Sequence, residues 1–208
     1  MLLAGDTRMP VDTRLIAVCG ADGAGKSTLV AELERRQDLP DCAYLSPPAT
    51  TGSNAALLGR YAGPVPGNDF FEAMSVARVY DYLEFYDNAV RPLIGTKRFV
   101  VCDGYMTCFI GQLKSMGSSF PIEASCAQVK QPDLTLYVQA PASLIDQRLS
   151  VRSDNSAHEL TRIACRYHEN YMQWLPHSSP AYCIIDNSGT AEETGARAGE
   201  ELRRHFAG

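Results

Sequence analysis

The sequence predicts one three-layer α/β domain, in which a parallel sheet is covered by helices on both faces. Short apolar runs bounded by turn residues recur along the chain, and each has the length of a strand buried on both faces. Segments with helical periodicity lie between these runs, which is the alternation expected of a parallel sheet. At 208 residues and 45% hydrophobic content, the chain is long enough for one well-formed core.

The elements follow from these patterns in chain order. Helices are expected at about 70–91, where Asp69 and Glu72 form a capping-box pattern, and at about 157–175. Residues 1–13 are expected to form a flexible extension, and 14–208 a single domain. The expected strands are Leu15 to Cys19, Ala43 to Leu45, Phe99 to Cys102, Leu134 to Val138 and Tyr182 to Ile185.

Charge and cysteine usage narrow the class of protein. The net charge of -5 gives no overall basic surface, so we expect neither a nucleic-acid nor a membrane partner. No stretch approaches the roughly 18 apolar residues of a membrane span. The seven cysteines are scattered and include no C-x-x-C pair, which is typical of reduced, buried thiols in a cytoplasmic protein.

A phosphate-binding loop is predicted directly after the first strand. The segment "GADGAGKS" fits G-x-x-x-x-G-K-[ST] between a strand and a helix. Its glycines let backbone N–H groups converge on phosphate oxygens, while Lys26 reaches the β/γ-phosphates and Ser27 ligates Mg²⁺. The alternative is a glycine-rich turn without a ligand. The residues expected to bind ATP are Gly20, Ala21, Asp22, Gly23, Ala24, Gly25, Lys26, Ser27 and Thr28.

The remaining sequence favours a small-molecule kinase among proteins with such a loop. A guanine-reading N-K-x-D sequence is missing, which disfavours a GTPase, and the chain is short for a motor or transporter ATPase. Asp103 ends the apolar run "FVVCD", where a carboxylate could hold hydrated Mg²⁺ or orient the phosphoryl acceptor. The alternative for Asp103 is a turn or helix N-cap residue.

Four stretches in order resemble the thymidylate kinase family of nucleoside monophosphate kinases: "GADGAGKST", "ARVYDYLEFYDNAVRPLIGTKRFVVCDGY", "QPDLTLYVQAPASLIDQRLSVR" and "IDNSGTAEE". Together they cover most of the chain from Leu15 onward. The resemblance implies a five-stranded parallel sheet in a P-loop kinase fold with a short lid at about 148–160. It also implies ATP and Mg²⁺, a small-molecule nucleotide acceptor, and a surface that permits a homodimer.

The resemblance assigns three residues to the acceptor. Asp22 matches an acidic position that approaches the acceptor's sugar hydroxyl, and Arg78 matches an arginine that contacts its base or phosphate. Tyr105 matches the aromatic residue that closes the family's D-R-[YF/H] motif. The alternatives are a turn residue for Asp22, a surface ion pair for Arg78 and ordinary core packing for Tyr105.

Arginines at the predicted lid are candidates for charge stabilisation during transfer. Arg148 and Arg152 are four residues apart, so a helix places them on one face, and Arg162 is a third candidate. A guanidinium there stabilises the charge that develops on the transferring phosphoryl group. The alternative is a solvated helix face. The expected catalytic residues are therefore Lys26, Asp103, Arg148 and Arg152, and the expected metal ligands are Ser27 and Asp103.

The sequence departs from the family on the acceptor side. The D-R-Y motif reads "DGY", with Gly104 in place of an arginine, and the R-E-P-like segment reads "YLSPPATTGS". Three functions stay open. The first is a kinase for dTMP or a related nucleotide, including a modified one. The second is a kinase for a nucleoside or small alcohol, with Asp103 or Asp22 as base. The third is a non-catalytic nucleotide-binding regulator.

Overall fold

The computed structural model describes residues 11–47, 68–115, 121–151, 167–173, 175–176, 179 and 181–207. Within them a five-stranded parallel sheet has the order β2-β3-β1-β4-β5, which confirms the predicted three-layer α/β class. Each predicted strand is present and is one residue longer than expected. The strands are β1 (Arg14–Cys19), β2 (Cys42–Leu45), β3 (Phe99–Asp103), β4 (Leu134–Gln139) and β5 (Tyr182–Asp186).

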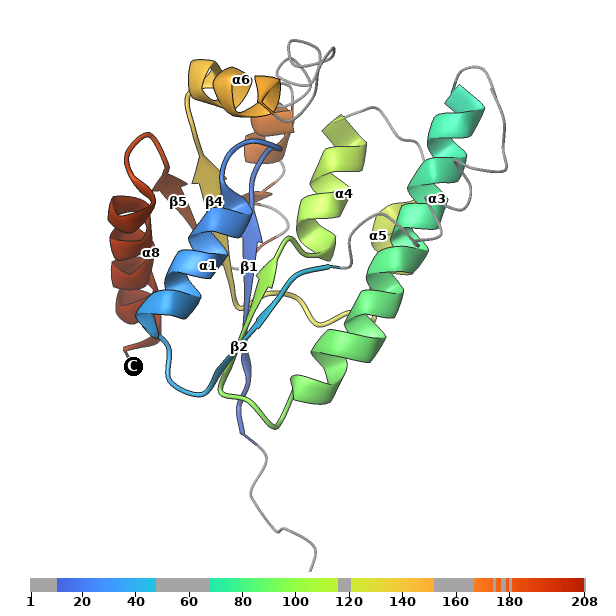
Figure 1. The fold of residues 1–208 in the computed structure, drawn as a ribbon. Coiled ribbons are helices and arrows are strands. Elements are labelled where there is room, and N and C mark those ends of the chain that lie inside the picture. Colours follow the sequence, from blue (N-terminus) through green and yellow to red (C-terminus); the bar gives the residue numbers. More distant parts are fainter. Residues whose placement is uncertain are drawn as a thin grey trace, which may run out of the picture.

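Helices cover both faces of the sheet (Figure 1). On one side lie α1 (Lys26–Arg36) and α8 (Ala191–Phe206), and on the other lie α3 (Asn68–Phe85) and α4 (Met106–Ser115). The short α5 (Ile122–Ser125) follows α4 in the chain, and α6 (Ala142–Ser150) stands at the carboxyl end of the strands. In the described ranges no helix has both the length and the apolar character that crossing a membrane requires.

The central strand β1 is buried on both faces. Leu15, Ala17 and Cys19 belong to the core under α3 and α4, whereas Ile16 and Val18 belong to the core under α1 and α8. All five side chains are 0% exposed. Because β1 lies between β3 and β4, its carboxyl end is where the chain's winding changes direction, the usual ligand crevice of an open parallel sheet.

Two expected helix boundaries differ from the structure. The helix α3 begins at Asn68, so Asp69 lies within its first turn and not ahead of it as a cap. A π-helical stretch at 86–90 and a 3₁₀ turn at 91–93 continue α3. Of the helix expected at 157–175, the structure describes residues 167–173 and 175, and all of them are helical.

The beginning of the described chain is bound to the rest of the fold. The backbone N–H of Val11 donates to the carbonyl of Gly95 at 3.0 Å, and the Thr13 hydroxyl donates to the carbonyl of Lys97 at 2.7 Å. Residues 11–13 were expected in a flexible extension. Their hydrogen bonds to the loop before β3 correct this expectation, while residues 1–10 lie outside the described chain.

A stack of three tyrosine rings fills the core beside α4. The ring of Tyr171 lies 5.1 Å from those of Tyr137 and Tyr167, measured between centroids, and its side chain is 0% exposed. Gly111 in α4 faces this stack so closely that a Cβ on it would overlap the Tyr171 ring. The stack therefore requires the smallest residue at position 111.

Gly111→Ala tests this packing. Helix propensity alone would make alanine about 1 kcal/mol more favourable. We expect the overlap with Tyr171 to win, because overpacking a core costs about 1–3 kcal/mol, and the free energy of unfolding in urea to fall. The same substitution in a Tyr171→Leu background, which removes the ring edge, is the control. An increase in stability in the otherwise wild-type chain would contradict the prediction.

Candidate active site

A cavity of about 840 Å³ opens at the carboxyl ends of β1 and β3. It collects residues from the loop after β1, the start of α1, the segment after β2, helix α3, the end of β3, helix α6, the loop after β5 and the start of α8. The lining residues are Asp22, Gly23, Gly25, Lys26, Ser27, Thr28, Ser46, Pro47, Arg78, Asp81, Tyr82, Asp103, Arg148, Asn187 and Ala191.

The loop after β1 has a backbone that requires glycine at two close approaches. Gly20 has φ 150°, and a Cβ there would lie 2.5 Å from the carbonyl oxygen of Val138. Gly25 has φ 100°, a left-handed conformation, and a Cβ there would overlap the side-chain amide of Asn187. The glycines of the motif therefore serve close contacts with β4 and with the loop after β5.

The structure divides the predicted ATP-binding residues into two groups. Those from Asp22 to Thr28 line the cavity, apart from Ala24. Gly20, Ala21 and Ala24 do not, and the alanine side chains are 5% and 1% exposed because they pack into the two cores. The methyl groups of Ala21 and Ala24 thus anchor the loop to both faces of the sheet.

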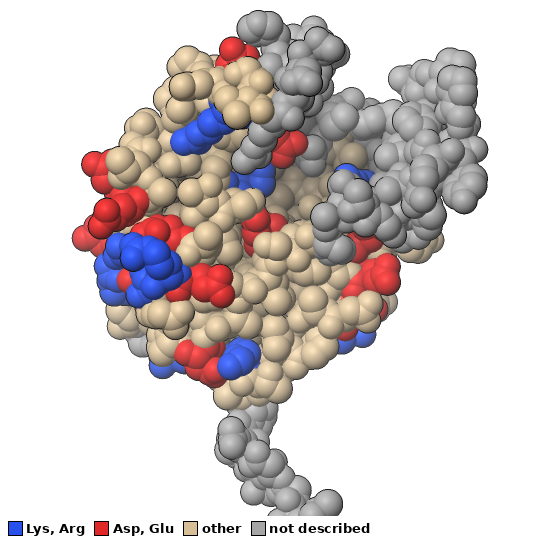
Figure 2. Space-filling model, viewed as in Figure 1, with Lys and Arg blue, Asp and Glu red and all other residues tan. Residues whose placement is uncertain are grey.

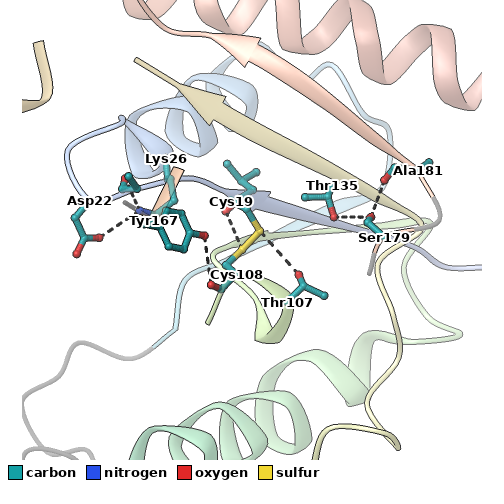
Figure 3. Close-up of a disulfide and its surroundings, with 11 residues drawn as sticks. Cys19, Asp22, Lys26, Thr107, Cys108, Thr135, Tyr167, Ser179 and Ala181 are labelled. Atoms are coloured by element: carbon teal, nitrogen blue, oxygen red, sulfur yellow. Dashed lines mark hydrogen bonds and ion pairs between the residues drawn. A yellow bond between two sulfur atoms is a disulfide. The ribbon is translucent and has the colours of Figure 1, made fainter. Parts of the chain in front are cut away.

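Lys26 and Asp22 lie together at the cavity wall. The ammonium of Lys26 donates to the carbonyl oxygen of Ala21 at 3.1 Å and lies 3.4 Å from a carboxylate oxygen of Asp22 (Figure 3). The Asp22 side chain is 69% exposed. The charged end of Lys26 is therefore held beside the loop backbone.

Ser27 and Asp103, the predicted metal ligands, both line the cavity. Their hydroxyl and carboxylate oxygens are the donors that Mg²⁺ prefers, so this donor set fits the ion. In the described part of the chain, no group of three or more His, Cys, Asp or Glu side chains could hold a metal. Mg²⁺ that arrives with a nucleotide needs no such group because it retains water and phosphate ligands.

Arg148 reaches the phosphate loop from the end of α6. One of its guanidinium nitrogens donates to the carbonyls of Gly23 and Ala24, each at 3.1 Å. The other lid candidates, Arg152 and Arg162, lie outside the described residues, as does the lid beyond residue 151. Arg148 is thus the predicted lid arginine that the described structure brings to the cavity.

Asn187, just after β5, is a cavity residue that the sequence analysis does not predict. Its amide nitrogen donates to the carbonyl of Ala24 at 2.6 Å, and its side chain is buried. The available signal was its position, since a polar residue directly after a parallel strand lies at the same edge as the phosphate loop.

The far end of the cavity is built on α3. Arg78, Asp81 and Tyr82 line it, and the Tyr82 ring stacks on Phe109 with centroids 4.8 Å apart. Burial is the main reason that the pKa of Tyr82 is raised to about 12. The positive charge of Arg78 lowers this pKa, whereas the negative charges of Asp22, Asp103 and Asp81 raise it. The Tyr82 hydroxyl therefore stays protonated at neutral pH among these charged groups.

Asp81 and Tyr82 are further site residues without a sequence prediction. The signal for Tyr82 was its spacing of four residues from Arg78, which places both on one face of a helix. No comparable pattern singles out Asp81, whose side chain is 8% exposed.

The D-G-Y motif begins at Asp103, the last residue of β3. Its other two residues, Gly104 and Tyr105, have different surroundings. Tyr105 does not line the cavity. Its side chain is 1% exposed, its hydroxyl donates to the carbonyl of Lys130 at 2.8 Å, and burial raises its pKa. This placement corresponds to the core-packing alternative. A Cβ on Gly104 would lie 3.7 Å from the Tyr82 hydroxyl, so Gly104 faces the α3 end of the cavity.

A disulfide joins the base of the phosphate loop to α4 (Figure 3). Cys19 ends β1 and Cys108 lies in the first turn of α4, with Cα atoms 5.3 Å apart. The expectation of reduced thiols is therefore wrong for this pair. The partners are 89 residues apart in sequence, and only the packing of α4 against β1 brings them together. The described free cysteines are Cys42, Cys102, Cys126 and Cys183.

Comparisons with known proteins agree with this fold. No family model matches the sequence. A probable thymidylate kinase of Pyrobaculum aerophilum is 25% identical over 193 residues, covering 91% of this chain and 96% of the relative. A probable thymidylate kinase of Methanospirillum hungatei is 24% identical, covering 92% and 95%. The structure of thymidylate kinase from Candida albicans superposes with a TM-score of 0.69 at 17% identity, covering 96% and 95%.

The phosphate loop follows the central strand of a five-stranded parallel sheet, and a second set of charged side chains lines the same cavity. These two features define a P-loop kinase. Within this class the chain is similar to proteins named thymidylate kinase over more than 90% of its length, in agreement with the resemblance seen in the sequence. A cytoplasmic location and a homodimer stay predictions.

The disulfide provides a direct test. In protein denatured without reductant, we expect alkylation to modify two fewer cysteines than after reduction, as measured by the intact mass. Reduction should lower the free energy of unfolding by about 2–4 kcal/mol, because the cross-link restricts the unfolded chain. The control is Cys102→Ser, at a described free cysteine, which should keep the difference of two. Equal alkylation before and after reduction would contradict the pairing.

Proposed function

We propose that this chain transfers the γ-phosphoryl group of ATP to a nucleoside monophosphate, dTMP or a related nucleotide, giving the diphosphate and ADP. One observation carries the proposal: a single cavity is lined both by the phosphate loop and by Arg78, Asp81 and Tyr82 of α3. Two phosphate-bearing substrates that meet head to head require this arrangement. The relatives named thymidylate kinase support the choice of acceptor.

At the ATP end, this chain's own groups supply positive charge and backbone donors. Lys26 swings from the Ala21 carbonyl and Asp22, its present partners, to the β/γ-phosphates. The N-terminus of α1 adds the positive end of its dipole. Arg148, already bound to the loop, places a second cation at the cavity. These groups stabilise charge on the transferring phosphoryl oxygens.

Ser27 and Asp103 would hold Mg²⁺ through a hydroxyl and a carboxylate, the second directly or through water. When bound, the ion would supply positive charge that offsets the negative charge of the phosphates. Asp103 is placed by β3, whose register with β1 pairs it with Val18, two residues before the phosphate loop begins at Gly20. The ligands therefore come from the end of β3 and from the first turn of α1, the helix that follows the adjacent strand β1.

At the acceptor end, Arg78 binds the acceptor's phosphate or base, and the protonated Tyr82 hydroxyl offers a hydrogen bond. Asp22 faces the sugar hydroxyl. Together they hold the acceptor oxygen in line with the γ-phosphorus, and this positioning supplies most of the catalysis in phosphoryl transfer. A phosphate acceptor is already ionised, so the reaction needs no strong general base.

A kinase for an unphosphorylated nucleoside or small alcohol is the second candidate. Two observations at the acceptor end favour it. Gly104 occupies the position of the family arginine and faces Tyr82. Three carboxylates, from Asp22, Asp81 and Asp103, act on Tyr82, against the single cation of Arg78 in the described part of the chain. A carboxylate there could take the proton that an alcohol must lose.

An enzyme-coupled assay that reports ADP production as a change in absorbance tests the reaction. With Mg-ATP we expect dTMP or a related monophosphate to stimulate turnover and free nucleosides not to. Lys26→Ala should lose at least about 100-fold in kcat, because a contact made to the transferring group disappears. The matched control is Lys97→Ala, whose ammonium pairs with Asp41 at 2.8 Å outside the cavity lining.

Stimulation by nucleosides alone would replace the first candidate with the second. If no acceptor stimulates ADP release, the proposed transfer is wrong. Near-normal turnover in Lys26→Ala would remove the phosphate loop from the mechanism.

Arg78→Ala tests the acceptor end separately. We expect the KM for the acceptor to rise about 10-fold or more, because a charge-assisted hydrogen bond is lost, while the KM for ATP changes little. Arg91→Ala is the matched control, since Arg91 is 60% exposed and pairs with Asp87 at 2.9 Å. An acceptor KM equal to that of the wild type would exclude Arg78 from the acceptor site.

A further inference from the structure

The side chain of Asn187 connects three parts of the fold. Its amide nitrogen donates to the carbonyl of Ala24 in the phosphate loop at 2.6 Å. Its amide oxygen accepts from the Thr194 hydroxyl of α8 at 2.8 Å, and its backbone N–H donates to the carbonyl of Gln139 at the end of β4, at 2.7 Å. Both ends of the amide are thus engaged, and the residue is 5% exposed.

The orientation of this amide follows from its partners. A backbone carbonyl can only accept a hydrogen bond, so the nitrogen of Asn187 has to face Ala24 and the oxygen has to face the hydroxyl of Thr194. The loop therefore receives a donor whose direction is set by β4 and α8, two elements outside the motif.

Holding the Ala24 carbonyl also orients the next backbone donor. A trans peptide is planar, and its C=O and N–H point in opposite directions. The bond from Asn187 to the Ala24 oxygen therefore directs the N–H of Gly25 away from Asn187. Arg148 donates to the same oxygen at 3.1 Å, and two donors on one carbonyl polarise the peptide and strengthen its N–H as a donor.

The glycine of the motif is shaped to this contact. Gly25 has φ 100°, and a Cβ there would overlap the Asn187 amide. Position 25 therefore lacks a side chain in part because Asn187 occupies that space. Both residues line the cavity, together with Ala191 at the start of α8.

We propose that Asn187 is a positioning residue for phosphoryl transfer: it fixes the Ala24–Gly25 peptide so that the Gly25 N–H faces the phosphates of ATP. This role rests on the proposed kinase function. It acts through the loop backbone, and neither a contact with the adenine base nor general support of the fold is required for it.

The test uses two variants. Asn187→Leu keeps a side chain of similar size but removes the donor, and Asn187→Ala serves if the leucine variant does not fold. Thr135→Val is the matched control, because Thr135 and Ser179 form a buried side-chain hydrogen bond of 2.9 Å within the sheet (Figure 3). Each variant is measured for stability in urea, for kcat and the KM of ATP and acceptor, and for calorimetric binding of tripolyphosphate, which has no base.

We expect both Asn187 variants to lose about 10-fold to 100-fold in kcat, as a misplaced contact group does, and about 10-fold in tripolyphosphate affinity. The KM of the acceptor should stay within about 3-fold of the wild type. Thr135→Val should keep both the kcat and the tripolyphosphate affinity of the wild type while its stability in urea falls. Tripolyphosphate affinity equal to wild type in both Asn187 variants would overturn the role. Equal losses of kcat and affinity in Thr135→Val would also overturn it.

Failure of the kinase proposal remains distinguishable. If the wild type binds tripolyphosphate but no acceptor stimulates ADP release, the transfer reaction is wrong, and the binding comparison alone then decides whether Asn187 orients the loop.

Discussion

The site depends on how the carbonyl groups of one short loop are held. A backbone carbonyl near the core needs a hydrogen-bond donor, and here side chains act beside one backbone donor, the Ala24 N–H, which donates to the Ala21 carbonyl at 3.1 Å. Lys26 serves Ala21, Arg148 serves Gly23 and Ala24, and Asn187 also serves Ala24. The carbonyls are thus satisfied by α1, α6 and the loop after β5, which leaves backbone N–H groups for an anion. The side chains around the loop are therefore part of the phosphate site as much as the motif itself.

The parallel sheet explains why these donors meet. All five strands end at the same edge, so the segments after β1, β3, β4 and β5 converge although they are far apart in sequence. Acidic and basic side chains lie beside one another over α1 and α8 (Figure 2), where Arg36 and Arg203 both pair with Asp38. The positive charge that the mechanism needs comes from side chains that the fold brings to the cavity, Lys26 and Arg148. It does not come from the overall charge of the surface.

The strands and the phosphate loop were predictable because their signals are local. A strand buried on both faces has to be apolar, as Ile16 and Val18 are, and the motif has a fixed spacing. Contacts across the chain gave no such signal: Asn187 meets Ala24 over 163 residues, and the disulfide partners are 89 residues apart. Tyr105 shows that a local motif can also mislead. The family motif placed it at the acceptor, whereas its hydroxyl satisfies a core carbonyl.

The disulfide has a consequence for the integrity of the chain. Because it joins Cys19 to Cys108, the polypeptide between them forms a closed covalent ring that includes the phosphate loop, α1, β2, α3 and β3. A ring opened at a single peptide bond remains one molecule. After one proteolytic cut between these cysteines, Lys26 and Asp103 would therefore stay attached to each other through sulfur as well as through the sheet, and the two pieces would part only once the disulfide is reduced.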